Sequence, residues 1–324
     1  MTSAIRIHTH GGPEVMVWEP VPTSEPNAGE VLVRHTAVGL NYIDVYFRTG
    51  LYKSPTMPAT LGMEAAGIVM ALGEGVTGFA VGDRIAYATG PIGAYTTDRS
   101  IAANRIVKIP DGISDETAAA MMLQGLTAQY LLRRTYRVTS GETIVVHAAA
   151  GGVGLILCQW AKSLGVTVIG VVSTQEKADL ALASGAAHVV IGHEKLPSEV
   201  KRITGGAMVP VVYDSVGKDT FASSIDSLAP LGMMVSFGSA SGPVPPVDLG
   251  MLNAKGSLFL TRPGLATYTS KRTDLENSAQ DLFDVVQSGA VSIQVRQTFA
   301  LSDAAAAHRA LEARQTTGST VLTP

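Results

Sequence analysis

The chain has 324 residues, 46% of them hydrophobic, and a formal net charge of −3 at pH 7. Such a chain can bury a large core, and about two domains are expected at this length. Because Lys and Arg are dispersed and do not outnumber the acidic residues, nucleic acid is not expected as the main partner. The single cysteine, Cys158, excludes an internal disulfide and a multi-cysteine zinc site, and it fits a reducing, cytoplasmic location.

The first part of the chain, residues 1 to about 110, alternates short apolar segments such as Glu30–His35 with glycines. This pattern predicts a twisted β domain. A helix is expected from about Ser114 to Arg134, with Asp115 and Glu116 in its first turn, where acidic side chains are favourable. The helix is expected to connect the β domain to the next part of the chain.

An uncharged run at residues 143–161, with a positive mean hydropathy of +0.24 for the chain, raises the alternative of a transmembrane segment. The run contains glycines, His147 and Gln159, and it begins with the β-rich stretch Thr143–Val146. We therefore expect a strand followed by a helix, with no insertion into a membrane.

From Thr143 to Leu260 the chain alternates apolar runs with helical segments. Parallel strands need long connections that cover both faces of the sheet, so this alternation predicts an α/β fold with a doubly wound parallel sheet. The expected strands are Thr143–Val146, Val166–Val172, His188–Ile191, Val209–Tyr213, Met233–Phe237 and Ser257–Leu260. The tail is expected to return to the first domain as a helix, a strand and a helix, at Asp274–Ser288, Val291–Phe299 and Ala304–Arg314.

The stretch HAAAGGVG, from His147 to Gly154, joins the first of these strands to a helix. Ala149, Gly151 and Gly154 have the spacing of the G-x-G-x-x-G motif, in which bare backbone approaches a pyrophosphate at a helix N-terminus. Glycines at such a turn could also serve tight packing alone. The position favours a dinucleotide site.

The end of the second strand lacks the Asp or Glu that usually binds the ribose hydroxyls of NAD. Val172 and Ser173 stand there, and Lys177 follows. Ser173 can donate a hydrogen bond to a 2′-phosphate and Lys177 can supply charge, so the sequence favours NADPH. Lys177 could instead be an ordinary solvated lysine, with Glu176 unfavourable for a phosphate.

Five segments in this order carry a resemblance to a known family: Asn41–Tyr46, Leu61–Gly67, Gly125–Thr127, His147–Gly154 and Asp214–Gly217. Together they resemble the zinc-independent NADPH:quinone oxidoreductases, the zeta-crystallin group of the medium-chain dehydrogenase/reductase superfamily. The resemblance covers essentially the whole chain.

That resemblance implies a Rossmann NADPH-binding domain at residues 126–261, inserted into a GroES-like catalytic and substrate domain made of residues 1–125 and 262–324. It also implies a homodimer joined through the edge of the nucleotide-binding sheet, near Met233–Leu260. The implied activity is the NADPH-dependent reduction of quinones, by hydride or by single electrons.

Zinc alcohol dehydrogenases of this superfamily carry a Cys near the position of Asn41 and Gly-His-Glu where this chain has Gly62-Met63-Glu64. Met63 cannot replace imidazole on Zn²⁺, so no metal is expected. His8 and His10 lack a third ligand and are expected to flank a strand and a turn. Without a Lewis acid the acceptor must delocalise charge itself, which favours quinones over simple ketones.

The site residues are carried over by position from the resemblance. Asn41 and Tyr46 are the expected catalytic donors, and Tyr52 joins them at the substrate, with Arg48 and Lys53 at the mouth. The expected nucleotide contacts are Tyr46, Tyr130, Ala149, Gly151, Gly152, Val153, Gly154, Ser173, Lys177, His193, Gly217, Phe237, Gly238, Ser239, Thr261, Arg262 and Arg314. Gly192 stands where close relatives have Tyr, so His193 is expected to replace part of the lost phosphate contact.

Two other functions remain open from the sequence. One is an NADPH-dependent reductase of α,β-unsaturated aldehydes or ketones, which delocalise charge as an enolate. The other is a non-catalytic, crystallin-like protein that binds NADPH without useful turnover. The presence of both Asn41 and Tyr46 favours turnover.

Overall fold

The computed structural model describes residues 2–23, 25–54 and 56–324, which fold into two compact units. We call the first the terminal unit; it comprises the chain up to Leu126 together with Tyr268–Gln287 and Ile293–Pro324. The second, the central unit, comprises Thr127–Thr267 and Ser288–Ser292. The first crossing between the units falls inside helix α2 (Asp115–Tyr130).

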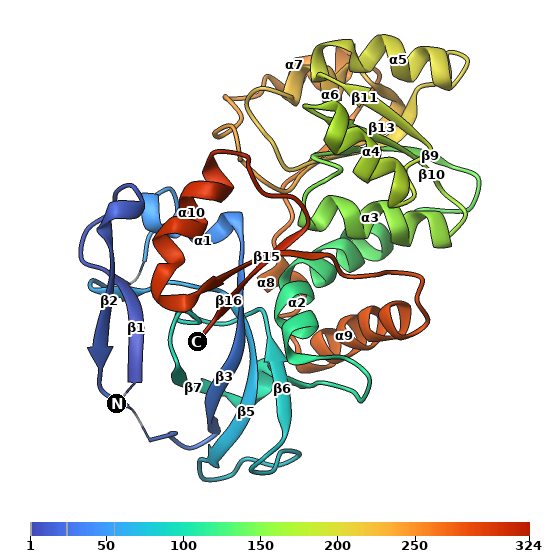
Figure 1. Cartoon of the computed structure of the whole chain (residues 1–324). Helices are drawn as coiled ribbons and strands as arrows, with labels where there is room; N and C mark the ends of the chain where they lie inside the picture. Colours follow the sequence, from blue (N-terminus) through green and yellow to red (C-terminus); the bar gives the residue numbers. More distant parts are fainter. Residues whose placement is uncertain (1, 24, 55) are drawn as a thin grey trace. The chain divides into compact units, whose positions relative to one another are not determined.

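The central unit is a doubly wound sheet with the strand order β11-β10-β9-β12-β13-β14, in which every neighbouring pair is parallel. This order is that of a Rossmann fold and confirms the predicted fold class. Helices α3 and α4 cover one face and α5 and α6 the other (Figure 1). The elements are β9 (Thr143–His147), α3 (Gly152–Ser163), β10 (Thr167–Val172), α4 (Gln175–Ala183), β11 (His188–Ile191), α5 (Leu196–Ile203), β12 (Val209–Asp214), α6 (Phe221–Ile225), β13 (Leu228–Ser236), α7 (Leu249–Ala254) and β14 (Phe259–Thr261), followed by α8 (Leu265–Tyr268).

The core of this unit explains the near-continuous apolar runs of its strands. Val145, Ile169, Val212 and Met234 from neighbouring strands are buried together, because helices cover both faces of a parallel sheet. Strand β13 begins five residues before the predicted Met233. The prediction missed this part because Pro230 and Gly232 interrupt the apolar pattern there.

The terminal unit is built on the sheet β15-β16-β3-β5-β6-β8, with β7 also paired to β3, and on a smaller sheet β2-β1-β4. Its core gathers side chains of both sheets, among them Ile5 and Val33, together with Tyr95 from the loop before β7. The elements are β1 (Thr2–Ile7), β2 (Met16–Val21), β3 (Glu30–Leu40), α1 (Tyr42–Thr49), β4 (Ala59–Thr60), β5 (Glu64–Leu72), β6 (Arg84–Tyr87), β7 (Asp98–Ala102), β8 (Val107–Lys108), α9 (Arg272–Gln287), β15 (Val295–Ala300), α10 (Ala304–Glu312) and β16 (Ser319–Thr323).

The tail of the chain completes the sheet of the terminal unit. β16 pairs antiparallel with β3, and β15 pairs parallel with β16 (Figure 1). The predicted strand start at Val291 was wrong: Val291 is buried, but β15 begins only at Val295. Strand β16 was not predicted, because its residues end the chain without a clear alternation.

The uncharged run 143–161 forms β9 and most of α3, and no helix within the described ranges is long and apolar enough to cross a membrane. After α2 the chain continues as a π-helix, Leu131–Thr135, whose first carbonyl accepts the Tyr213 hydroxyl at 3.0 Å. Cys158 is fully buried in α3, and burial raises the pKa of its thiol to about 12.

Candidate active site

The turn between β9 and α3 is the predicted pyrophosphate-binding segment. A side chain at Gly154 would collide with the backbone of Ala148 and Ala149, so this glycine is required by packing. A Cβ at Gly151 would lie 3.2 Å from the Ala148 carbonyl oxygen, a tight contact rather than a collision, and Gly151 and Gly152 are both half-exposed at the start of α3. Packing therefore explains Gly154, while Gly151 and Gly152 are partly exposed at a helix N-terminus, the kind of place where anions bind.

The end of β10 brings the predicted phosphate residues to one edge of the sheet. Ser173 is exposed, and Thr174 caps α4 by accepting the Lys177 N–H at 3.3 Å. The neighbouring strand β11 ends beside β10, where the Gly192 N–H donates to the Val172 carbonyl at 3.0 Å. His193 follows with its side chain 32% exposed and 3.3 Å from Glu194.

The end of β12 holds a buried polar cluster that the sequence analysis did not identify. Asp214 is fully buried, and its Oδ1 accepts the N–H groups of Val216 and Gly217 at 2.8 and 3.1 Å. Its Oδ2 accepts the hydroxyls of Thr220 and Ser224 at 2.7 and 2.8 Å. The carboxyl thus fixes the loop that carries Gly217. Ser224 also lies 2.9 Å from His147 Nε2 at the end of β9, and burial lowers the pKa of that histidine.

The ends of β13 and β14 carry the last predicted nucleotide contacts of this unit. Phe237, Gly238 and Ser239 follow β13, and Thr261 ends β14. The Arg262 guanidinium donates to the Gly238 carbonyl at 2.6 Å and to the Ser236 carbonyl at 3.2 Å. These contacts fasten the loop after β13 to β14, at the carboxyl ends of the strands where doubly wound folds bind nucleotides.

The predicted substrate residues lie in the terminal unit, around the start of α1. Asn41 directly follows β3, is 7% exposed, and its N–H donates to Asp44 Oδ2 at 2.8 Å. Tyr46 and Tyr52 are stacked edge to face, with ring centres 5.2 Å apart, and the Tyr52 N–H donates to the Tyr46 carbonyl. Tyr46 and Tyr52 are therefore in contact, and Asn41 lies at the start of α1, the helix that carries Tyr46.

Two fully buried carboxyls adjoin Asn41 and were not predicted as site residues. Burial raises the pKa of Asp44 to about 7 and that of Glu64 to about 8. Tyr95 donates its hydroxyl to Asp44 Oδ2 at 3.0 Å, and Asn41 donates its side-chain N–H to Glu64 Oε1 at 2.5 Å. A charged residue inside the otherwise apolar segment 61–69 was the available signal for Glu64.

The expected place of Arg48 at the mouth of the site was wrong. Its side chain is 1% exposed and forms a two-pronged ion pair with Glu312, at 2.7 and 2.8 Å. It also donates to His308 Nδ1 at 3.0 Å, and burial lowers the pKa of His308 to about 3. Arg48 therefore joins α1 to α10. Lys53 is exposed, as a residue at a site entrance would be.

Two further predicted contacts have less distinctive surroundings. Tyr130 is the last residue of α2 and is 3% exposed, within the central unit. Arg314 is exposed in the terminal unit, two residues beyond the end of α10, with a left-handed backbone at φ 59°. Tyr130 therefore belongs to the central unit and Arg314 to the terminal unit.

Comparison with known proteins identifies the family. Two family models match: the alcohol dehydrogenase GroES-like domain at residues 27–143 and the zinc-binding dehydrogenase at residues 152–282. The chain is 53% identical to a quinone oxidoreductase of Pseudomonas aeruginosa over 100% of both chains. This chain belongs to the quinone oxidoreductase family of the medium-chain dehydrogenase/reductase superfamily.

This member of the quinone oxidoreductase family is also similar to two other proteins over nearly its full length. The structure of Escherichia coli quinone oxidoreductase complexed with NADPH has a TM-score of 0.97 and 47% identity, covering 99% of this chain and 100% of its own. A 2-haloacrylate reductase of a Burkholderia species is 44% identical over 100% of this chain and 99% of its own.

Zinc does not fit the donor set of this quinone oxidoreductase family chain, although one matching model is described as zinc-binding. Asn41 and Met63 stand at the positions the resemblance gives to zinc ligands, and neither side chain is a usual ligand of Zn²⁺. Across residues 2–23, 25–54 and 56–324, no group of three or more His, Cys, Asp or Glu side chains could hold a metal ion. His8 pairs with Glu19, and His10 bonds backbone carbonyls in the last turn of α1.

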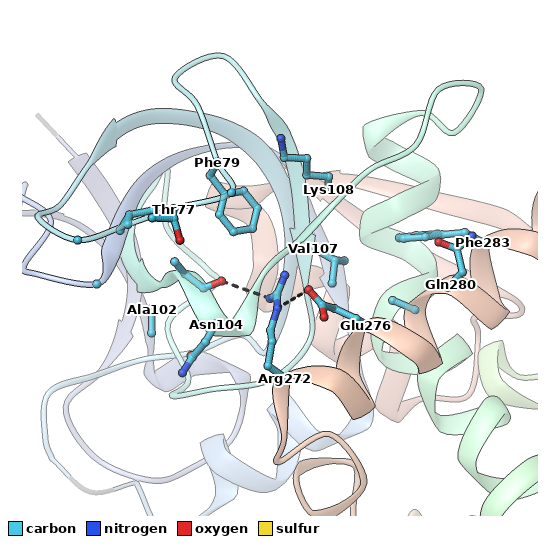
Figure 2. Close-up of a pocket in the computed structure, with 16 residues that line it drawn as sticks. Thr77, Phe79, Ala102, Asn104, Val107, Lys108, Arg272, Glu276, Gln280 and Phe283 are labelled. Atoms are coloured by element: carbon cyan, nitrogen blue, oxygen red, sulfur yellow. Dashed lines mark hydrogen bonds and ion pairs between the residues drawn. The ribbon is translucent and has the colours of Figure 1, made fainter.

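A separate hollow of about 760 Å³ lies on the terminal unit of this quinone oxidoreductase family chain, between a glycine-containing loop and α9 (Figure 2). Lys108 Nζ and Arg272 Cζ each lie 5.8 Å from the ring centre of Phe79. Both cations are paired with carboxylates, Lys108 with Asp83 and Arg272 with Glu276, each at 2.8 Å. The predicted nucleotide and substrate residues do not line this hollow.

Proposed function

We propose that the protein reduces quinones with NADPH as the electron donor. The observation that carries this proposal is its 47% identity, over nearly the full length, to a quinone oxidoreductase whose structure is complexed with NADPH. The 53% identity to the Pseudomonas aeruginosa quinone oxidoreductase supports the same substrate class.

The nucleotide is proposed to bind the central unit, with residues 126–261 as the binding domain. Gly151, Gly152 and Val153 are half-exposed at the N-terminus of α3, beside the buried Ala149 and the close-packed Gly154, and this turn is proposed to bind the pyrophosphate because α3 offers N–H groups there. The remaining proposed nucleotide contacts are Gly217, Phe237, Gly238, Ser239, Thr261 and Arg262, with Tyr46, Tyr130 and Arg314.

Selection of NADPH over NADH is proposed to depend on Ser173, Lys177 and His193. Ser173 follows β10, His193 follows β11 and Lys177 lies in the first turn of α4. These places support the proposal, since a hydroxyl and a cation favour a phosphate where an acidic side chain would repel it. A titration of the protein with NADPH and with NADH should give the lower Kd for NADPH, and Lys177→Ala should weaken NADPH binding more than NADH binding.

The acceptor is proposed to bind Asn41, Tyr46 and Tyr52 in a substrate domain made of residues 1–125 and 262–324. When bound, NADPH supplies the hydride. The N–H of the Asn41 side chain and the hydroxyl of Tyr46 are proposed to hold the acceptor oxygen, and Tyr46 or solvent to provide the proton. A strong acid is not needed, because a quinone delocalises the added charge as a phenolate.

A conjugated double bond is the second candidate acceptor. The 44% identity to a 2-haloacrylate reductase favours it specifically, because a haloacrylate is reduced at a carbon–carbon double bond next to a carboxyl group. The third function, NADPH binding without turnover, becomes the conclusion if no acceptor is reduced.

We further propose a homodimer in the cytoplasm. Strand β14 is at the edge of its sheet, and Phe259 and Leu260 on it are 56% and 37% exposed, which favours pairing with a second strand. A single, buried cysteine supports a reducing compartment.

The activity test measures NADPH oxidation with 1,4-benzoquinone, 9,10-phenanthrenequinone, a 2-alkenal and 2-chloroacrylate. We expect the quinones to give the highest kcat/KM, and Asn41→Ala and Tyr46→Phe each to lower it. Asn41→Ala should leave the Kd for NADPH within about twofold of the wild type, because Asn41 is not among the proposed nucleotide contacts. Stronger turnover of the alkenal or the chloroacrylate would replace quinones as the substrate class. Tight NADPH binding without oxidation in any of the four reactions would refute an enzymatic role.

A further inference from the structure

The carboxyl of Glu64 lies beside Gly39, in space that a side chain at position 39 would fill. Glu64 begins β5 and pairs with Gly39 on β3. A Cβ at Gly39 would collide with the Glu64 carboxyl and with the Ala119 carbonyl. Because Gly39 has no side chain, the carboxyl can lie against β3, where it reaches Asn41 two residues further along the chain.

Both oxygens of this carboxyl accept hydrogen bonds from fixed N–H groups. Oε1 accepts the Asn41 side-chain N–H and Oε2 accepts the Leu123 backbone N–H, each at 2.5 Å. Because Oε1 and Oε2 both accept N–H hydrogen bonds, the carboxyl meets the nitrogen of the Asn41 carboxamide and not its oxygen. Glu64 thereby determines which end of the carboxamide faces it.

The opposite end of the Asn41 carboxamide is held by Gln124. The Gln124 side-chain N–H donates to Asn41 Oδ1 at 3.2 Å. Gln124 is oriented in turn by Ser319 on β16, whose hydroxyl donates to Gln124 Oε1 at 2.7 Å. The nitrogen and the oxygen of the Asn41 carboxamide are therefore assigned by partners on both sides.

This orientation matters for an acceptor that gains negative charge. The Asn41 nitrogen carries two hydrogens, and Glu64 takes one of them. A fixed N–H donor stabilises charge that develops on an oxygen, whereas a flipped carboxamide would present its own oxygen lone pair and oppose the reaction.

The surroundings of Glu64 are costly for a carboxyl, which supports a functional reason for its presence. Its side chain is fully buried, and its hydrogen-bond partners are two neutral N–H groups rather than a cation. The ionisable groups around it are Asp44 on α1, Tyr87 on β6 and Tyr95, and the charge of Asp44 opposes the ionisation of Glu64. Shifted acids of this kind concentrate at functional sites.

We propose that Glu64 and Gln124 are positioning residues, which hold the Asn41 carboxamide so that its second N–H stays available to the acceptor oxygen. This inference rests on the proposed function, because it takes Asn41 as the donor to the acceptor. Glu64 and Gln124 act through Asn41 and make no contact with the acceptor themselves.

The test is a pair of double-mutant cycles, measured as kcat/KM with the best acceptor and NADPH. Glu64→Gln keeps one acceptor oxygen for two N–H donors, and Gln124→Leu removes the partner of Asn41 Oδ1. We expect each to lower kcat/KM by about threefold to tenfold, and to change it by less than about twofold when Asn41→Ala is already present, because residues that act as a unit are not additive. Gln287→Leu, an exposed glutamine of the same unit, is the matched control and should leave kcat/KM unchanged.

The outcomes separate this inference from the proposed function. If Glu64→Gln and Gln124→Leu are as harmful with Asn41→Ala as without it, or harmless in both backgrounds, the positioning role is overturned while the quinone reductase activity stands. If the wild type does not oxidise NADPH with any of the four acceptors, the proposed function fails and the inference with it. Should Glu64→Gln not fold, the Gln124→Leu cycle decides alone, and the Kd for NADPH monitors the integrity of each variant.

Discussion

Gly39 is a residue on which both packing and the position of Glu64 depend. Its backbone is an ordinary strand, so its lack of a side chain matters for space rather than for conformation. The glycine is 25 positions away from Glu64 in the chain, and only the antiparallel pairing of β3 with β5 brings them together.

Gly39→Ala should therefore destabilise the protein and disturb the site. We expect a loss of about 1–3 kcal/mol in the free energy of unfolding, the usual cost of an overpacked core, together with lower kcat/KM. Urea unfolding and the quinone assay measure these two effects. Gly264→Ala is the control, because a Cβ there meets no atom within 4 Å; equal losses in both variants would contradict the packing argument.

The raised pKa of Glu64, about 8 against an ordinary 4.5, links the stability of the protein to pH. The unfolded chain ionises this carboxyl near pH 4.5, whereas the folded chain keeps it protonated up to about pH 8. Its contribution to stability is therefore complete below the lower pKa and is lost as the pH rises through the higher one. We expect Glu64→Gln, which does not ionise, to gain stability relative to the wild type between pH 5 and 8.

Urea unfolding of the wild type and Glu64→Gln at a series of pH values measures this difference. Asp44, whose pKa is raised in the same direction by burial, is present in both proteins and does not account for a difference between them. A constant gap in unfolding free energy across the pH range would show that Glu64 ionises as freely in the folded chain as in the unfolded one.

Site residues could be predicted where the sequence pattern around them is sufficient. The prediction failed where their partners are distant in the sequence. The eight residues from His147 to Gly154 predict a strand-to-helix turn, and the structure has the turn there. Arg48 reads as a surface residue in its own segment, but its partners His308 and Glu312 lie about 260 positions later. Glu64 is visible as the one charge in the segment 61–69, but its role was missed because its partners Asn41 and Leu123 are distant in the sequence.

At the scale of elements, the loop after β12 depends on one carboxyl. Asp214 accepts four hydrogen bonds inside the protein, two from backbone N–H groups and two from hydroxyls. This arrangement fixes the start of α6 and the place of Gly217 together. The cluster links β12 to β9 through Ser224 and His147.

Asp214→Ala should leave these donors without an acceptor. We expect it to reduce the free energy of unfolding by at least about 3 kcal/mol, because each buried unsatisfied donor costs roughly 1–3 kcal/mol, and to raise the Kd for NADPH. Asp248→Ala is the matched control: this aspartate accepts the Gly250 N–H at 2.9 Å on an exposed cap, and its loss should cost only about 1 kcal/mol. Similar losses for the two variants in urea unfolding would contradict the role given to Asp214.

Strands could be predicted where burial on both faces makes their sequence a continuous apolar run. The strands of the central sheet are covered on both faces, so most of them were located to within a residue or two. Prediction failed at β13, where Leu231 adopts a left-handed backbone between Pro230 and Gly232. It also failed at β16, which is held by pairing with β3 and β15 rather than by its own pattern.

At the scale of the whole molecule, the proposed homodimer makes the edge of the central sheet a testable surface. Phe259→Glu places a charge on β14, where charged side chains oppose edge-to-edge pairing. We expect this variant to elute as a monomer, with light scattering giving half the mass of the wild type. Val81→Glu, at a residue 64% exposed in the terminal unit, should keep the wild-type mass. A monomeric wild type, or a dimeric Phe259→Glu, would rule out this interface.

The sole thiol of the chain, Cys158, lies inside α3 with 0% exposure. Its burial and its raised pKa leave almost no thiolate for a maleimide, so the native protein should stay unlabelled under mild conditions. Cysteines introduced at one exposed position in each unit would then be the only attachment points for a fluorescent donor and acceptor. Energy transfer between such dyes would follow the separation of the two units in solution as nucleotide is added, without removal of the native residue.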